Sequence, residues 1–91
     1  MTNSELITQL EKTIENVPDF PIPGIQFKDI TPIFLNPKLY EAVIKNLADF
    51  SHGKIDAVCG IESHGYLFGI AIAVALDVPF VLIRKKGKLP P

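Results

Sequence analysis

The stretch GIESHGYLFGIAIAVALDVPFVLIRKKGK, at residues 60–88, decides the fold of this chain. It runs from a glycine-bounded turn through a long apolar segment to a break at Asp77-Val78-Pro79, and then through a short apolar run into four cations. The pattern predicts a strand (55–60), a helix (65–76) and a second strand (80–83). A strand, a helix and a strand in this order form a βαβ unit, whose two strands are parallel. We therefore predict an α/β fold.

Two features of this stretch attract anions. The turn at residues 60–66 leads into a helix start, where free backbone N–H groups and the positive end of the helix dipole favour negative charge. The basic segment 84–88 follows the second strand. In an open parallel sheet, ligands bind beyond the carboxyl ends of the strands. The two features together indicate a polyanionic small molecule, a phosphate or diphosphate ester.

The composition limits the classes of function. The chain has 91 residues, 47% of them hydrophobic and 21% charged, with a net charge of -1. This composition is typical of one small globular domain, and the charge argues against general nucleic-acid binding. The longest apolar run, residues 66–76, is shorter than the ~20 residues needed to span a bilayer, and the N-terminus does not resemble a signal peptide. We expect a cytoplasmic protein that binds neither nucleic acid nor membrane.

Two helices are predicted ahead of the βαβ unit. The first spans residues 4–16 with Ser4 as its N-cap, and the second spans residues 36–50 with Asn36 as its N-cap. Between them, prolines preclude regular structure up to Ile25, after which residues form a short extended piece at 26–30.

The strands and the helix of the βαβ unit are expected to be largely buried. Cys59, the single cysteine, lies in the first of these strands and is expected to be a buried, inert thiol. Two parallel strands do not make an independently stable sheet. We therefore expect residues 36–91 to be the first part of a larger α/β core, truncated after its second strand.

Common phosphate-binding and nucleophile motifs do not fit the turn at residues 60–66. Gly60 and Gly65 have the spacing of a Walker A loop, but Tyr66 and Leu67 stand where that loop needs Lys and Ser or Thr. A P-loop NTPase is therefore excluded. A dinucleotide-binding Gly-x-Gly-x-x-Gly and a Gly-x-Ser-x-Gly elbow are also missing from the sequence.

Three motifs in this order resemble the adenine phosphoribosyltransferase family: DFPIPGIQFKDITPI (19–33), GIESHGY (60–66) and IRKKGKLP (83–90). The resemblance covers nearly the whole chain. It implies a phosphoribosyltransferase-type (Rossmann-like) parallel sheet with an N-terminal helix and a base-binding hood, which together make up residues 1–35. It also implies purine salvage: a glycosyltransferase moves 5-phosphoribosyl from phosphoribosyl pyrophosphate (PRPP) to adenine, giving AMP and pyrophosphate. The family is homodimeric and uses Mg²⁺ bound through PRPP.

The resemblance also implies two groups of site residues. In the hood, the ring of Phe27 stacks on adenine while the backbones of Gln26 and Lys28 read its edge. The residues that hold PRPP and pyrophosphate are Glu62, Ser63, His64, Arg84, Lys85 and Lys88. A non-proline cis peptide joins Glu62 to Ser63 in the family. Glu62 is expected to order its loop rather than to touch phosphate. No catalytic residue and no metal ligand is expected within this chain.

The sequence departs from the family in two ways. His64 stands where the family usually has Arg, a permanent bidentate phosphate donor, so weaker and more pH-dependent PRPP binding is expected. The loop that binds the ribose hydroxyls and 5-phosphate is missing, so the chain alone is expected to lack turnover. Two other readings stay open. One is a non-catalytic purine- or phosphate-binding or assembly module completed by another chain, and the other is a nucleotide-binding regulator on the same fold.

Overall fold

The computed structural model describes residues 1–90. By its internal contacts the chain divides into a first unit, Met1–Val43, and a second unit that begins at Ile44. The boundary falls inside a helix, and the division into domains 1–35 and 36–91 stays a prediction. Among the described residues, no helix is both long enough and apolar enough to cross a membrane.

The first unit begins with helix α1 (Asn3–Thr13), which is capped by Thr2 and not by Ser4 as predicted. The Thr2 hydroxyl accepts a hydrogen bond from the Glu5 amide at 3.1 Å, and the Glu5 carboxylate accepts one from the Thr2 amide at 3.2 Å. Such a capping box needs an acid three residues after the cap, a condition that Thr2 meets and Ser4 does not. These hydrogen bonds to Thr2 hold the pKa of Glu5 below its ordinary value. Their contribution to stability is therefore lost as the pH falls through that lowered pKa.

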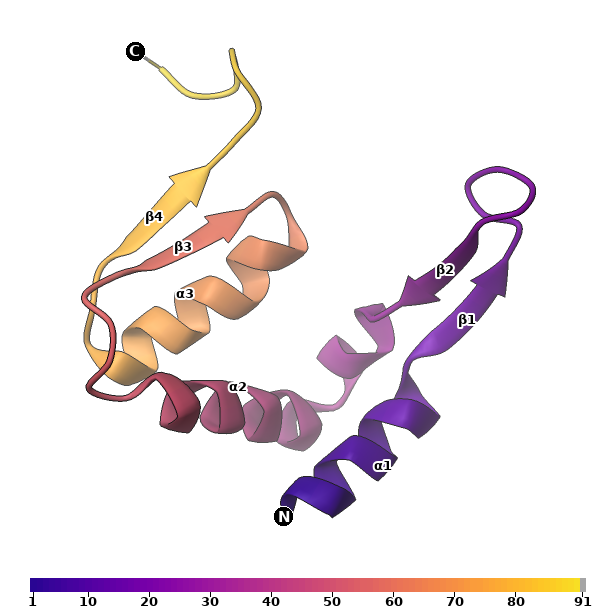
Figure 1. The fold of residues 1–91 in the computed structure, drawn as a ribbon, viewed down its shortest axis with the longest axis horizontal. Helices are drawn as coiled ribbons and strands as arrows, with labels where there is room; N and C mark the ends of the chain where they lie inside the picture. Colours follow the sequence, from indigo (N-terminus) through magenta and orange to yellow (C-terminus); the bar gives the residue numbers. More distant parts are fainter. Residues whose placement is uncertain (91) are drawn as a thin grey trace. The chain divides into compact units, whose positions relative to one another are not determined.

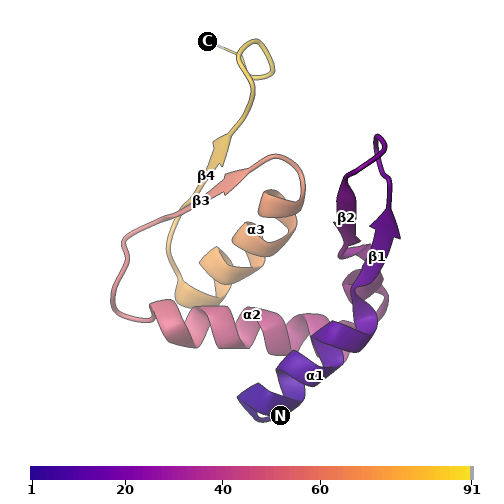
Figure 2. The same cartoon turned by 45° about the vertical axis from the view of Figure 1, so that its right-hand side comes forward.

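A β-hairpin follows α1 and was only partly predicted (Figure 2). Strand β1 (Glu15–Pro18) pairs antiparallel with strand β2 (Gln26–Asp29), which corresponds to the predicted extended piece. The predicted helix 4–16 is too long because its last two residues, Glu15 and Asn16, belong to β1. In the connecting loop, the Gly24 amide donates to the Asp19 carboxylate at 2.8 Å.

The core of the first unit lies between α1, the 3₁₀-helix η1 (Thr31–Leu35) and the start of α2 (Pro37–Ser51). Its buried members are Leu6, Ile33 and Leu39. The Asn36 side-chain oxygen accepts a hydrogen bond from the Leu39 amide at 3.1 Å, so the predicted N-cap of the second helix is confirmed.

The second unit contains the predicted βαβ arrangement. Strand β3 (Val58–Ile61), helix α3 (His64–Leu76) and strand β4 (Phe80–Ile83) follow one another, and β3 pairs parallel with β4 (Figure 1). The strand predicted at 55–60 begins later, at Val58, whose amide donates to the Pro79 carbonyl at 3.0 Å. Pro79 has no N–H of its own, so the ladder does not extend further back.

Burial in the second unit is lower than predicted. Ile61 on β3 is 67% exposed and Val74 on α3 is 76% exposed, and the Cys59 thiol is also exposed. Side chains alternate between the two faces of a strand, and Gly60 of β3 lies on the face toward the helix. Cys59 and Ile61 therefore point to the opposite face, which α3 does not cover. The prediction of a buried thiol was wrong for this reason.

Helix α3 lies close to the sheet because two glycines make room for one aromatic ring. A methyl group added at Gly60 or at Gly69 would collide with the ring of Phe80, and one at Gly60 would also meet the Gly65 carbonyl at 2.7 Å. The Phe80 ring thus occupies a notch whose walls are the backbones of β3 and α3. This packing fixes the distance between the strand and the helix that follows it.

Replacing Gly69 by alanine tests this packing. In an ordinary helix interior the change stabilises by about 1 kcal/mol, but overpacking of the kind expected here costs about 1–3 kcal/mol. We expect Gly69→Ala to lower the urea midpoint of unfolding in the wild-type background. In a Phe80→Leu background, which lacks the ring carbons at the notch, the same change is expected to raise the midpoint. Additive effects of the two substitutions in this double-mutant cycle would contradict the packing.

Candidate functional site

Two turns leave the β3–β4 sheet at the same edge. Ile61, the last residue of β3, is in register with Ile83, the last residue of β4, and the strands are parallel. The Glu62-Ser63 connection into α3 and the basic segment 84–88 therefore begin side by side, as the arrowheads of β3 and β4 in Figure 1 show. The predicted pyrophosphate-binding residues of both turns belong to this edge.

The first turn presents the start of α3. Ser63 lies at the N-cap in a helical conformation, and its side chain makes no capping hydrogen bond. The Ser63 carbonyl accepts hydrogen bonds from the Tyr66 amide at 3.1 Å and from the Leu67 amide at 3.4 Å, which begins the helical ladder and sets the positive end of the helix dipole at this turn. His64 is the first residue of the helix.

The peptide between Glu62 and Ser63 is trans, which corrects the expectation of a cis bond. In residues 1–90 the only cis peptide is Phe20–Pro21. For a residue that is not proline, the trans form is lower in free energy by about 3 kcal/mol, and this turn adopts it.

Glu62 connects the two turns. Its Oε1 atom accepts a hydrogen bond from the Lys85 amide at 2.6 Å, and its Oε2 atom lies 3.8 Å from a guanidinium nitrogen of Arg84. The Glu62 amide also donates to the Ile83 carbonyl at 3.4 Å. The structure therefore brings together Glu62, Arg84 and Lys85, as the adjacent strand ends predicted.

Tyr66 makes a further link that the sequence reasoning missed. Its hydroxyl donates to the Ile83 carbonyl at 2.8 Å, and its ring lies edge-on to Phe80 with centroids 6.2 Å apart. Tyr66 was noted as the last residue of the motif at 60–66 and as a misfit to the Walker A pattern, and no role of its own was predicted for it. The signal that could have found it is an aromatic hydroxyl within the first turn of a helix, close to the end of the neighbouring strand.

The basic segment closes into a tight turn. The Lys88 amide donates to the Lys85 carbonyl at 3.1 Å, and Gly87 adopts a φ of 89°, which an L side chain rarely tolerates. Lys85, Lys86 and Lys88 are all exposed. The turn therefore places three ammonium groups within four residues at the edge of the sheet.

The predicted adenine-binding residues lie on β2. Pro18, opposite Gln26, has no N–H to donate, which makes this a non-hydrogen-bonded pair. Because the two kinds of pair alternate along an antiparallel ladder, the pair of Asn16 and Lys28 is of the same kind. The backbone N–H and C=O groups of Gln26 and Lys28 thus point away from β1 and are directed to the free edge of the hairpin.

The side chains of this group are partly engaged within the hairpin. Phe27 is half-buried, and its ring lies edge-on to that of Phe20 with centroids 5.2 Å apart. The Gln26 side-chain oxygen accepts a hydrogen bond from the Asn16 amide group at 3.0 Å. Phe27 is therefore neither a buried core aromatic nor a free ring, because it packs against Phe20.

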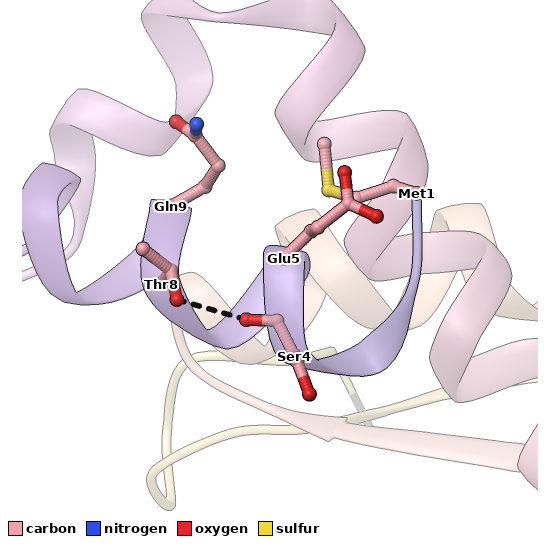
Figure 3. Close-up of a pocket in the computed structure, with 5 residues that line it drawn as sticks. All are labelled: Met1, Ser4, Glu5, Thr8 and Gln9. Carbon is pink, nitrogen blue, oxygen red and sulfur yellow. Dashed lines mark hydrogen bonds between the residues drawn. The ribbon is translucent and has the colours of Figure 1, made fainter.

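Two surface hollows lie along α1. The first, of about 260 Å³, is lined by Met1, Ser4, Glu5, Thr8 and Gln9, and the Thr8 hydroxyl donates to the Ser4 carbonyl at 2.9 Å (Figure 3). The second, of about 410 Å³, is lined by Ile7, Leu10, Glu11, Ile14 and Lys28. Lys28 is the one predicted site residue in either, so these hollows do not add a second functional cluster.

Comparison with known proteins identifies close relatives. An adenine phosphoribosyltransferase of Mycoplasmoides gallisepticum is 52% identical over 88 residues, which cover 96% of this chain and 49% of the relative. A crystal structure of adenine phosphoribosyltransferase from Thermoanaerobacter pseudethanolicus is 42% identical with a TM-score of 0.87, covering 92% of this chain and 51% of that one. No protein-family model matches.

A third relative was solved with bound ligands. It is the Saccharomyces cerevisiae adenine phosphoribosyltransferase in complex with adenine and an imino-altritol bisphosphate. It is 41% identical with a TM-score of 0.86, covering 97% of this chain and 55% of that one. The chain spans about half the length of the curated relatives it matches. The resemblance inferred from the sequence is thus confirmed, and this chain is a homologue of the adenine phosphoribosyltransferases with the fold of the corresponding part of these enzymes.

Proposed function

We propose that this chain provides the adenine-binding and pyrophosphate-binding elements of a purine-salvage phosphoribosyltransferase. The reaction transfers the 5-phosphoribosyl group of PRPP to N9 of adenine and releases AMP and pyrophosphate. The observation that carries the proposal is the meeting of two anion-attracting turns at one edge of the β3–β4 sheet, in a homologue of enzymes with this name. Cytoplasmic location and a homodimer are further expectations from the resemblance, and both stay predictions.

The pyrophosphate end of the site acts by electrostatic stabilisation. As the bond between the ribose carbon and the pyrophosphate oxygen breaks, negative charge accumulates on the leaving group. The start of α3, at Ser63 and His64, offers the positive end of the helix dipole, and Arg84, Lys85 and Lys88 offer full positive charges. Groups that are already oriented before the reaction stabilise such charge without reorganising.

Mg²⁺, when bound with PRPP, would supply additional neutralisation of the diphosphate charge. Among residues 1–90, no group of three or more His, Cys, Asp and Glu side chains could hold a metal ion. Arg84, Lys85 and Lys88 would neutralise the remaining charge of the diphosphate.

The adenine end of the site is built on β2. Backbone N–H and C=O groups at the free edge of Gln26 and Lys28 match the alternating acceptors and donors along the edge of adenine. The ring of Phe27, braced by Phe20 at 5.2 Å, would stack on the face of the base. The adenine bound in the yeast relative's structure supports a base of this kind as the ligand.

The main test is complementation of the chain with the remaining half of a relative. The 91 residues do not contain the Thr-Gly-Gly type turn that cradles the ribose 5-phosphate in the family. We expect adenine-dependent pyrophosphate release only when the chain is mixed with a polypeptide that carries this turn. Binding of adenine without release in the mixture would favour the binding-module alternative. Calorimetry that finds equal affinity for adenine, guanine and hypoxanthine would favour a regulator.

Adenine stacking is tested at Phe27. We expect Phe27→Ala to weaken adenine binding by about tenfold, because stacking of a base on an aromatic ring contributes about 1–3 kcal/mol. Phe27→Trp keeps a stacking surface and is expected to stay within about threefold of wild type. The affinities are measured by calorimetry, and Phe34→Ala serves as a control on a ring outside the hairpin. Equal loss in the alanine and tryptophan variants would argue that Phe27 only supports the hairpin.

The pH dependence of PRPP binding is tested at His64. A histidine loses its positive charge as the pH rises through neutrality, whereas arginine keeps it. We expect PRPP affinity of the wild type to fall, relative to His64→Arg, by up to about tenfold between pH 6 and pH 8. Comparing the two proteins at each pH cancels the titration of PRPP itself, and Lys88→Ala should shift affinity equally at every pH. A constant ratio between wild type and His64→Arg would refute the role of His64.

A further inference from the structure

Glu62 is a carboxylate in a place that should repel the proposed ligand. It lies between the start of α3 and a segment with four cations in residues 84–88. A carboxylate that contacted pyrophosphate directly would oppose its binding through like-charge repulsion. The contacts of Glu62 instead direct both of its side-chain oxygens to the basic segment.

The two carboxylate oxygens of Glu62 contact different groups of the basic segment. Oε1 accepts a short hydrogen bond of 2.6 Å from the Lys85 amide, which fixes the backbone at the start of the basic turn. Oε2 lies 3.8 Å from the Arg84 guanidinium, beyond the usual hydrogen-bond length of about 2.7–3.2 Å. The guanidinium is therefore attracted to Glu62 without committing its donors, and it stays about one-third exposed, at 35%.

The Lys85–Glu62 bond extends the ordering of the chain beyond the end of β4. The Tyr66 hydroxyl reaches only Ile83, the last residue of the strand. The bond from the Lys88 amide to the Lys85 carbonyl is internal to the turn. Of these three contacts, the one to Glu62 is the link between the basic turn and the β3–α3 connection.

From this geometry we infer that Glu62 is a positioning residue. It holds the backbone of Lys85 and the guanidinium of Arg84 so that the basic turn is presented beside the start of α3. It does so without contacting the anion itself. The inference rests on the proposed function, since it assigns to Glu62 the ordering of the pyrophosphate-binding cations.

The test compares two substitutions that separate hydrogen bonding from charge. Glu62→Gln keeps an oxygen that can accept from the Lys85 amide, whereas Glu62→Ala removes it. Asp56→Asn, at an exposed position ahead of β3, removes one negative charge elsewhere in the same unit. Each protein is titrated with inorganic pyrophosphate by calorimetry, and hydrogen exchange of the Lys85 amide is followed by NMR.

We expect Glu62→Ala to weaken pyrophosphate binding by about tenfold and to accelerate exchange of the Lys85 amide by at least about tenfold. Glu62→Gln and Asp56→Asn should both stay within about threefold of wild type in affinity. If Glu62→Gln and Glu62→Ala both tighten binding equally, Glu62 acts only as a repelling charge and the inference is overturned. Should Glu62→Ala fail to fold, Glu62→Gln still decides. A large loss of pyrophosphate affinity, or of protection of the Lys85 amide, in that variant overturns the inference.

Failure of the proposed function has a different signature. In that case the wild type does not bind pyrophosphate at all, and the inference is judged on hydrogen exchange. Lys85 protection that depends on the acceptor at position 62 would then support the ordering role alone. Protection that survives Glu62→Ala would overturn it.

Discussion

Parallel pairing of β3 with β4 is the constraint on which the candidate site depends. Because Ile61 and Ile83 are in register, the chain leaves both strands at one edge, and α3 must return along the sheet between them. The Phe80 ring, seated against Gly60 and Gly69, sets how closely that helix approaches the strands. A helix held further from the sheet would carry its N–H groups away from the basic turn. The packing of the Phe80 ring thus determines how close the positive end of α3 lies to the basic turn.

The charges at this edge are balanced within the protein. Four cations in residues 84–88 repel one another, and a segment of this kind is ordinarily mobile and solvated. Glu62 offsets part of this repulsion through a contact to the Arg84 side chain and another to the Lys85 backbone. The net charge of the edge remains positive, so the capacity to attract an anion persists. In the proposed site, Glu62 would order the basic turn and the cations would bind the anion, so the two roles could be varied separately.

Local signals were enough to predict some elements and not others. Strand β4 was predicted with its observed bounds because Pro79 and the cations delimit it, and the Asn36 cap fixed the start of α2. Strand β1 was missed because its partner lies ten or so residues away and its pairing overrides the helical periodicity before it. The prediction that Cys59 is buried was wrong because strand periodicity alone does not say which face of the sheet is covered. The candidate site residues were predicted from the three sequence motifs, whereas the hydrogen bond of Tyr66 to Ile83 was found only in the structure.

The exposed thiol of Cys59 has a practical consequence. As the single cysteine of the sequence, it can carry one fluorophore or spin label at a defined position, without competition from other thiols. Its side chain points away from α3, so a label there would leave the Phe80 notch undisturbed. It is three residues from Glu62 along the chain, close enough for a spectroscopic reporter to sense changes in the adjoining turn. A label on Cys59 could therefore be used to follow ligand binding over time.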